Sequence, residues 1–132
     1  MSFIVLLLVS CSSDSVPPLA GSYESRDTQG DGIFVHMAIQ PEEKTFVEYI
    51  SNREVDRGTY EEKSDNVYLF KGEKQEFEIT LSPEDSFYVT VHQLNEGKPI
   101  ELKNTGNIPT YFSTEYDDVE EYEKLLHENE EE

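Results

Sequence analysis

The residues of this chain that could do chemistry are one cysteine, three histidines and 29 acidic side chains. The thiol of Cys11 could act as a nucleophile, accept a lipid or bind a metal. His36, His92 and His127 could act as bases or metal ligands, but no two of them have the spacing of a metal site on one element. No Gly-x-Ser-x-Gly motif or triad context surrounds a candidate nucleophile. We therefore expect no catalytic residue, no metal site, no cofactor and no enzyme activity.

Cys11 follows an apolar run, FIVLLLV at residues 3–9, and the small residue Ser10. The run reaches the minimum length of a signal-peptide hydrophobic region, about 7 residues, and is far shorter than the roughly 20 residues that cross a bilayer. The segment Leu8-Val9-Ser10-Cys11 resembles the lipobox of bacterial lipoproteins, in which the peptide is cut before the cysteine and the thiol carries diacylglycerol. The resemblance implies a signal peptide over residues 1–10 and lipid attachment at Cys11. The alternative is a buried N-terminal strand with a core cysteine.

The same resemblance implies a location outside the cytoplasm. The protein would be lipid-anchored in the cell membrane or outer membrane and would face the periplasm or the exterior. We expect residues 11–20 to form a lipidated tether, which at ~3.3 Å per residue reaches at most about 30 Å from the membrane. Because Cys11 is the only cysteine, we expect no disulfide, and the fold has to be held together by its core.

Composition limits the domain count and the class of partner. About 110 residues follow the signal peptide and tether, which is enough for one small domain. The formal net charge is −19, so anionic lipid head groups repel the surface and the lipid itself has to anchor the protein. We expect no nucleic-acid partner, because phosphate contacts require clusters of Lys and Arg. Cationic partners remain open: metal ions, basic peptides or basic patches on another protein. The alternative is an acidic surface that is simply solvated and binds no partner.

One acidic segment imitates a calcium loop. Asp27-Thr28-Gln29-Gly30-Asp31-Gly32 begins like an EF-hand loop, with oxygen ligands at the first, third and fifth positions and glycine at the sixth. The twelfth position, where an EF-hand has a bidentate Glu, is Ala38, and the flanking residues predict strands. We interpret the segment as a β-turn.

The rest of the chain predicts an all-β domain over residues 21–113. Apolar residues alternate with polar ones, as at Phe77, Ile79 and Leu81, which is the period of a half-buried strand. Turn residues separate the candidate strands at short intervals, as in Ser82-Pro83-Glu84-Asp85. Short connections predict an antiparallel meander of seven or eight strands that closes into a small barrel or folds as a sandwich.

Two pairs of similar segments indicate an internal duplication, over about residues 21–50 and 58–91. GSYESR at residues 21–26 matches GTYEEK at residues 58–63, and IQPEEKTFVEYI at residues 39–50 matches LSPEDSFYVTV at residues 81–91. Both pairs occur in the same order, so we expect a three-strand unit that is used twice. This arrangement could bring His36 and His92 close together on neighbouring strands.

Residues 114–132 differ in pattern from the rest. Val119, Tyr122 and Leu126 fall on one helical face beside Leu125, and acidic residues occupy the early turns. We expect one helix over about residues 115–128, capped by Thr114, that packs on the barrel. An acidic tail follows it.

The Gly-x-Tyr opening strand, the lipobox tether and the small meander together resemble the lipocalin-like bacterial lipoproteins, a group that includes the N-terminal barrel of the copper-stress lipoproteins and small lipoproteins of unknown function. The likeness covers Gly21 to about Leu102. Copper handling does not carry over, because that group depends on a Cys-x-x-Cys pair that this chain lacks.

Two functions remain open for such a barrel. The first is a non-catalytic binding or interaction module that recognises a basic protein or peptide through a tyrosine-rich, acidic outer face. The alternative is a lipocalin-like carrier of a small apolar ligand inside the barrel; an envelope-stress sensor or an immunity-type inhibitor is a further idea. The first two differ in the barrel interior, which a binding module fills with the candidate core residues Val35, Met37, Phe77, Ile79, Phe87 and Val89.

Overall fold

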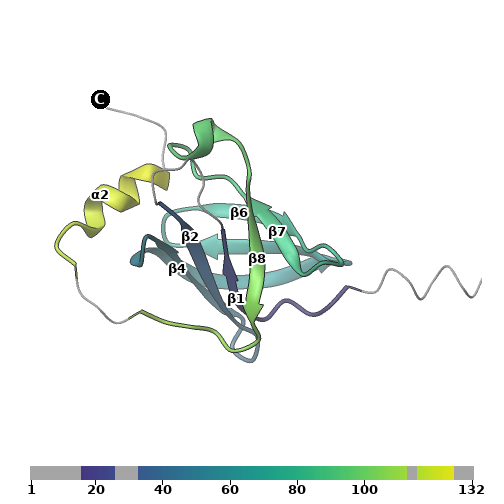
Figure 1. Cartoon of the computed structure of the whole chain (residues 1–132). Helices are drawn as coiled ribbons and strands as arrows, with labels where there is room; N and C mark the ends of the chain where they lie inside the picture. The colour runs from purple at the N-terminus through teal and green to yellow at the C-terminus, as the bar shows by residue number, and fades with distance from the viewer. Residues whose placement is uncertain (1–15, 26–32, 113–115, 127–132) are drawn as a thin grey trace, which may run out of the picture.

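A computed structural model describes residues 16–25, 33–112 and 116–126. It contains eight strands and a short C-terminal helix, which confirms the predicted all-β fold (Figure 1). The elements are β1 (Gly21–Glu24), β2 (Val35–Gln40), β3 (Thr45–Ile50), β4 (Arg53–Ser64), β5 (Val67–Gly72), β6 (Glu76–Thr80), β7 (Ser86–Val89), the 3-10 turn η1 (Asn95–Gly97), β8 (Ile100–Gly106), α2 (Val119–Glu123) and the 3-10 turn η2 (Lys124–Leu126).

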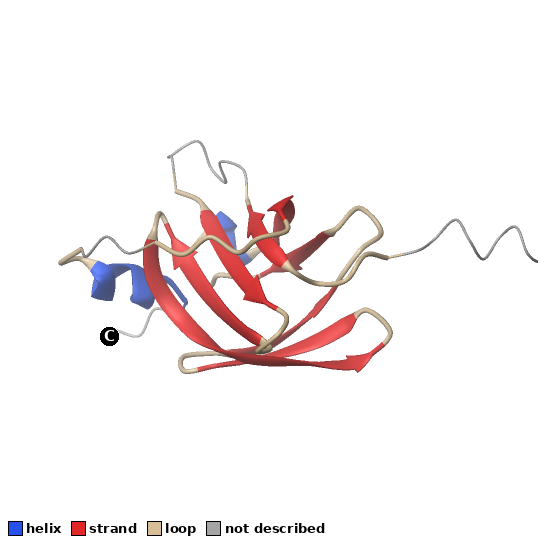
Figure 2. Cartoon of the chain, turned by 90° about the horizontal axis from the view of Figure 1, so that it is seen from below, coloured by secondary structure: helices blue, strands red, loops and turns tan. Residues whose placement is uncertain are grey.

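The strands form one antiparallel sheet in the order β6-β5-β4-β3-β2-β1-β8-β7. Its two edge strands, β6 and β7, are joined by a short turn and approach each other without forming a ladder. The sheet therefore curls into a nearly closed barrel with one seam between β6 and β7. Figure 2 shows the strands curving around a common interior, with the C-terminal helix at one side.

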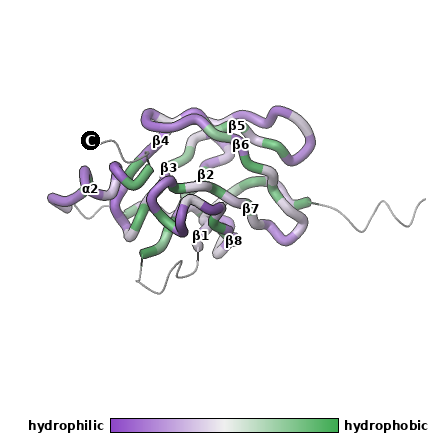
Figure 3. The backbone as a smooth tube through the Cα atoms, turned by 90° about the horizontal axis from the view of Figure 1, so that it is seen from above, coloured by the Kyte–Doolittle hydropathy of each residue, from purple (hydrophilic) through white to green (hydrophobic). Residues whose placement is uncertain are grey.

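Strand alternation places the core inside the barrel, as predicted. Val35, Met37 and Ile39 on β2 have no exposed surface, and apolar side chains of the other strands complete the cluster. Figure 3 shows the contrast between these apolar strand positions and the hydrophilic helix α2. The opposite face of β2 differs from the expected half-buried pattern, because His36 and Ala38 are also buried. Residues 107–112 after β8, here called the strap, cross the outside of the sheet at this place.

The ends of the barrel are closed by apolar residues from outside the strands. Leu19, within the range predicted as a tether, is 3% exposed and packs in the core. Leu126 of η2 is fully buried, and η2 bonds to Gln75 before β6 and Gln93 after β7. Since β1 starts at one end of the barrel and β6 starts at the other, Leu19 and Leu126 close opposite ends.

Within the described residues, the C-terminal helix starts later than predicted, since residues 116–118 precede it and are not helical. It covers Val119–Glu123 and continues as η2. Of the predicted apolar face, Leu126 is buried and Tyr122 and Leu125 pack against the core, whereas Val119 is half-buried outside that cluster. Asp118 takes the N-cap position without a side-chain cap bond, whereas the expected cap Thr114 lies outside the described residues. No helix in the described part of the chain is long and apolar enough to cross a bilayer.

The repeated segments share local structure but not a repeated three-strand unit. Gly21 and Gly58 each lie against a neighbouring strand, where an added Cβ would stand 2.0 Å from the carbonyl oxygen of Gly106 or Lys71. In both segments the tyrosine two residues later is buried in the core. Residues 21–50 contain three strands, β1 to β3, whereas residues 58–91 contain the second part of β4 followed by β5, β6 and β7. The second segment therefore has two strands, β5 and β6, where the first has only β2.

Candidate functional site

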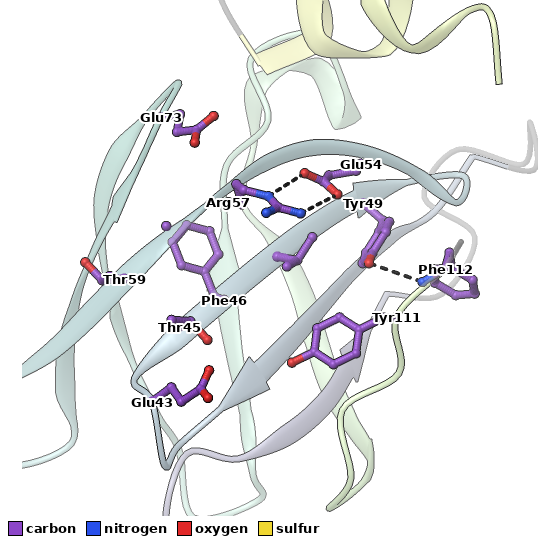
Figure 4. A pocket seen from close by; sticks show the side chains of 12 residues that line it. Glu43, Thr45, Phe46, Tyr49, Glu54, Arg57, Thr59, Glu73, Tyr111 and Phe112 are labelled. Carbon is purple, nitrogen blue, oxygen red and sulfur yellow. Dashed lines mark hydrogen bonds and ion pairs between the residues drawn. The ribbon is translucent and has the colours of Figure 1, made fainter. Parts of the chain in front are cut away.

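The candidate site is a groove of about 550 Å³ on the outer face of the barrel (Figure 4). Its floor is formed by β3 and β4, whose side chains Thr45, Val47 and Thr59 line it. The β2–β3 turn, the β5–β6 turn and the strap form its walls. The lining residues are Glu43, Thr45, Phe46, Val47, Tyr49, Glu54, Arg57, Gly58, Thr59, Glu73, Tyr111 and Phe112.

The strap holds the aromatic wall of the groove in place. Ser22 Oγ on β1 accepts a hydrogen bond from the backbone N–H of Thr110 at 2.9 Å, and Tyr49 Oη accepts one from the N–H of Phe112 at 3.2 Å. The Phe112 ring packs edge-to-face on Tyr49, with centroids 4.8 Å apart. These contacts leave the neighbouring side chain Tyr111 half exposed on the groove side, at 50%.

The groove is acidic even though it contains an arginine. Arg57 donates two hydrogen bonds to the carboxylate of Glu54, from Nε at 2.7 Å and from Nη2 at 3.1 Å. This bidentate pair raises the pKa of Arg57, so the guanidinium stays charged, and the carboxylate of Glu54 balances its positive charge. Glu43 and Glu73 add two further carboxyl groups, so the groove carries a net negative charge.

His36 lies behind the strap and is not placed to bind a metal with His92. Its ring is 3% exposed and packs against Tyr49 and Phe112 at centroid distances of 5.7 and 5.1 Å. Neither ring nitrogen has a hydrogen-bond partner among the described residues, and Nδ1 is 3.7 Å from a carboxylate oxygen of Glu24. Burial lowers the pKa of His36, and the charge of Glu24 opposes this shift. The ring therefore serves as packing for the strap.

His36 and His92, which repeats lying side by side could have brought together, lie apart. His92 is exposed in a turn after β7, and β1 and β8 lie between β2 and β7 in the sheet. The physical reason is that the chain closes its barrel through β8 and β1, so the two matched segments do not form neighbouring strands. Within the described residues, no group of three or more His, Cys, Asp or Glu side chains could hold a metal ion.

Two buried acids, Glu48 and Asp56, lie on neighbouring strands of the barrel. Glu48 on β3 is 2% exposed, points to the same face as Phe46, and has one carboxylate oxygen without a hydrogen-bond partner. Asp56 lies directly across from it on β4 and accepts the backbone N–H groups of Arg57, Lys74 and Gln75. Desolvation, and then repulsion by Asp56, raises the pKa of Glu48 to about 8. The raised pKa favours the neutral form of the carboxyl group, which is the form that can lie in the core.

Several sequence-predicted features lie outside the described residues: the signal peptide of residues 1–10, the predicted lipid attachment site Cys11, the loop of residues 27–32, the cap Thr114, His127 and the acidic tail. Of the expected tyrosine-rich outer face, the groove contains Tyr49 and Tyr111. Sequence reasoning missed Glu43, Arg57 and Glu73 as members of one site, because they come from two turns and one strand. A β-strand period could have placed Arg57 and Thr59 on one face, but not the turns beside them.

Comparisons with models of known protein families, with curated proteins and with solved structures find no match. Function is therefore inferred from the geometry of the groove, the packing of the barrel and the chemistry of the sequence.

Proposed function

We propose that the protein is a membrane-anchored extracytoplasmic lipoprotein, lipidated at Cys11, whose barrel is a non-catalytic binding module. Its binding site is the acidic, tyrosine-lined groove over β3 and β4. The observation that carries the proposal is the combination of a concave outer surface with the half-exposed Tyr111 at its wall. Aromatic side chains that are both exposed and held in place supply contact area at little entropic cost.

The packing of the interior supports a site on the outside. Val35, Met37 and Phe87 are at most 1% exposed, and Ile79 and Val89 at most 5%. Phe70 stacks on Phe77 with ring centroids 5.3 Å apart. An eight-stranded barrel is just wide enough to be filled by its own side chains or to hold one small ligand. A filled interior favours the binding module over the alternative, a carrier of a small apolar molecule.

The proposal can be tested by photo-crosslinking in living cells of the host. A photoreactive phenylalanine analogue would replace Thr59, which is exposed on the floor of the groove, and in a matched variant Thr80, which is exposed on β6 outside it. We expect a discrete crosslinked protein from position 59 and none from position 80. Crosslinks of equal yield at both positions, or at neither, would refute a binding role for the groove.

A further inference from the structure

The protein already contains one arginine-binding arrangement, at the start of β4. The guanidinium carbon of Arg53 lies 4.0 Å from the ring centroid of Tyr116 and 4.5 Å from that of Tyr122. Both oxygens of Asp118 accept hydrogen bonds from Arg53, each at 3.0 Å. Arg53 Nη1 also donates a hydrogen bond to the carbonyl oxygen of Ser51 at 2.7 Å. Two tyrosine rings, one carboxylate and one carbonyl oxygen thus hold this guanidinium and attach α2 to the barrel.

The groove offers the same chemical groups without an arginine to occupy them. Tyr111 is half exposed, and Glu43 is exposed on the β2–β3 turn; both line the groove, below the Arg57–Glu54 pair in the view of Figure 4. Within the described part of the chain, no Lys or Arg forms an ion pair with Glu43 or lies over the Tyr111 ring. Arg57 cannot fill this role, because Glu54 already holds its guanidinium.

We infer that the groove receives an arginine side chain from an extended basic segment of a partner protein, with the guanidinium stacked on Tyr111 and paired with Glu43. The inference rests on the proposed function and names the partner's chemistry. Arginine fits better than lysine, because its planar guanidinium stacks on an aromatic face and donates two parallel hydrogen bonds to a carboxylate. The net charge of −19 attracts such a segment over a long range and disfavours a second copy of this chain as the occupant.

The test uses the full lipidated chain in nanodiscs of phosphatidylcholine, a lipid without net charge, so that the membrane does not itself recruit a basic peptide. Titration calorimetry would compare three short peptides in which serine alternates with arginine, with lysine or with citrulline. Citrulline has nearly the shape of arginine but no charge. We expect the arginine peptide to bind several-fold more tightly than the lysine peptide, and the citrulline peptide to show no binding.

Variants separate the groove from general attraction to an acidic surface. Tyr111→Ala should weaken binding of the arginine peptide about 2- to 30-fold, the range of exposed to desolvated cation–π contacts, and Glu43→Gln should weaken it in the same direction. Tyr111→Phe should retain most of the affinity because it keeps the ring. Tyr88→Ala is the matched control, since Tyr88 is 57% exposed on β7, outside the groove.

Equal affinity for the arginine and lysine peptides, or an equal effect of Tyr88→Ala and Tyr111→Ala, would overturn the inference. So would failure of the arginine peptide to bind. These outcomes are independent of the crosslinking at Thr59, which addresses the proposed function. A partner could crosslink at Thr59 without being displaced by the arginine peptide. That result would support a binding role for the groove and would reject arginine as the group that it recognises.

Discussion

The buried carboxyl group of Glu48 makes the folded protein less stable at alkaline pH. Its pKa is about 8 in the folded protein and near 4.5 when the chain is unfolded, so between these pH values the folded state binds more protons. The contribution of this group is thus most favourable below pH 4.5, declines as the pH rises, and is fully lost above about pH 8. Since one pKa unit corresponds to 1.36 kcal/mol, the loss is about 5 kcal/mol.

Glu48→Gln should remove this dependence, because the amide is neutral at every pH. We expect the variant to differ little from the wild type at pH 5 and to have a higher free energy of unfolding at pH 9, by several kcal/mol. Urea unfolding of both proteins at the two pH values measures this. A difference between the two proteins that does not change with pH would show that Glu48 is ionised in the fold.

The buried ring of His36 has the opposite effect: it makes the folded protein less stable at acid pH. Because its pKa is lowered in the folded state, the unfolded chain binds the proton more readily, and stability falls as the pH drops below about 6.5. NMR titration of the imidazole should show that it stays neutral at pH values where a free histidine is half protonated. His36→Phe should lessen the loss of stability in acid. A ring that titrates at or above pH 6.5 would contradict its burial behind the strap.

At the scale of elements, η2 holds the open seam of the barrel. Leu126 is fully buried, and the η2 carbonyls accept bonds from Gln75 and Gln93 on the two sides of the seam. We expect Leu126→Ala to lower the free energy of unfolding by about 2–5 kcal/mol, the usual cost of a large cavity in a core. Leu125→Ala, at the half-buried neighbour, should cost clearly less. Urea unfolding compares the two, and equal losses would mean that η2 does not close the barrel.

The strands, their alternation and a C-terminal helix could be predicted from the sequence, but the strap across the outside of the sheet could not. The inward orientation of Met37 and Phe87 can be predicted, because apolar residues recur in their strands with a period of two. The burial of His36 depends on a strap from more than 70 residues later in the chain, which no local pattern contains. The β3–β4 turn was also missed: Ser51 and Asn52 adopt φ values of 48° and 72°, which suit a two-residue hairpin without the glycine that usually marks one.

The groove was only partly predictable for the same reason. Tyr111 could be recognised as one of many tyrosines near acidic residues, but its position over β3 depends on the strap. The charge of the site depends on the pairing of Arg57 with Glu54, which requires the bulged register of β4 against β3. The periodicity of apolar residues predicts which side of a strand faces the core. It does not predict that two turns and the strap come together over the outer face of β3 and β4.

For the whole molecule, the anchor is a prediction from residues 1–11. We expect metabolic labelling with an alkyne fatty acid to mark the wild-type protein and to leave Cys11→Ser unmarked, because only this thiol can accept the lipid. The labelled protein should partition into detergent on phase separation, since more than one acyl chain gives stable membrane attachment. Equal labelling of the two proteins would exclude Cys11 as the lipid site.

The central claim is that the barrel binds from its outer face and not through its interior. Native mass spectrometry of the protein, gently extracted from its own host, tests this most directly. The account predicts the mass of the chain with its lipid, alone or with a polypeptide partner that Tyr111→Ala releases. A small apolar molecule retained equally by wild type and Tyr111→Ala would contradict it and identify the barrel as a carrier.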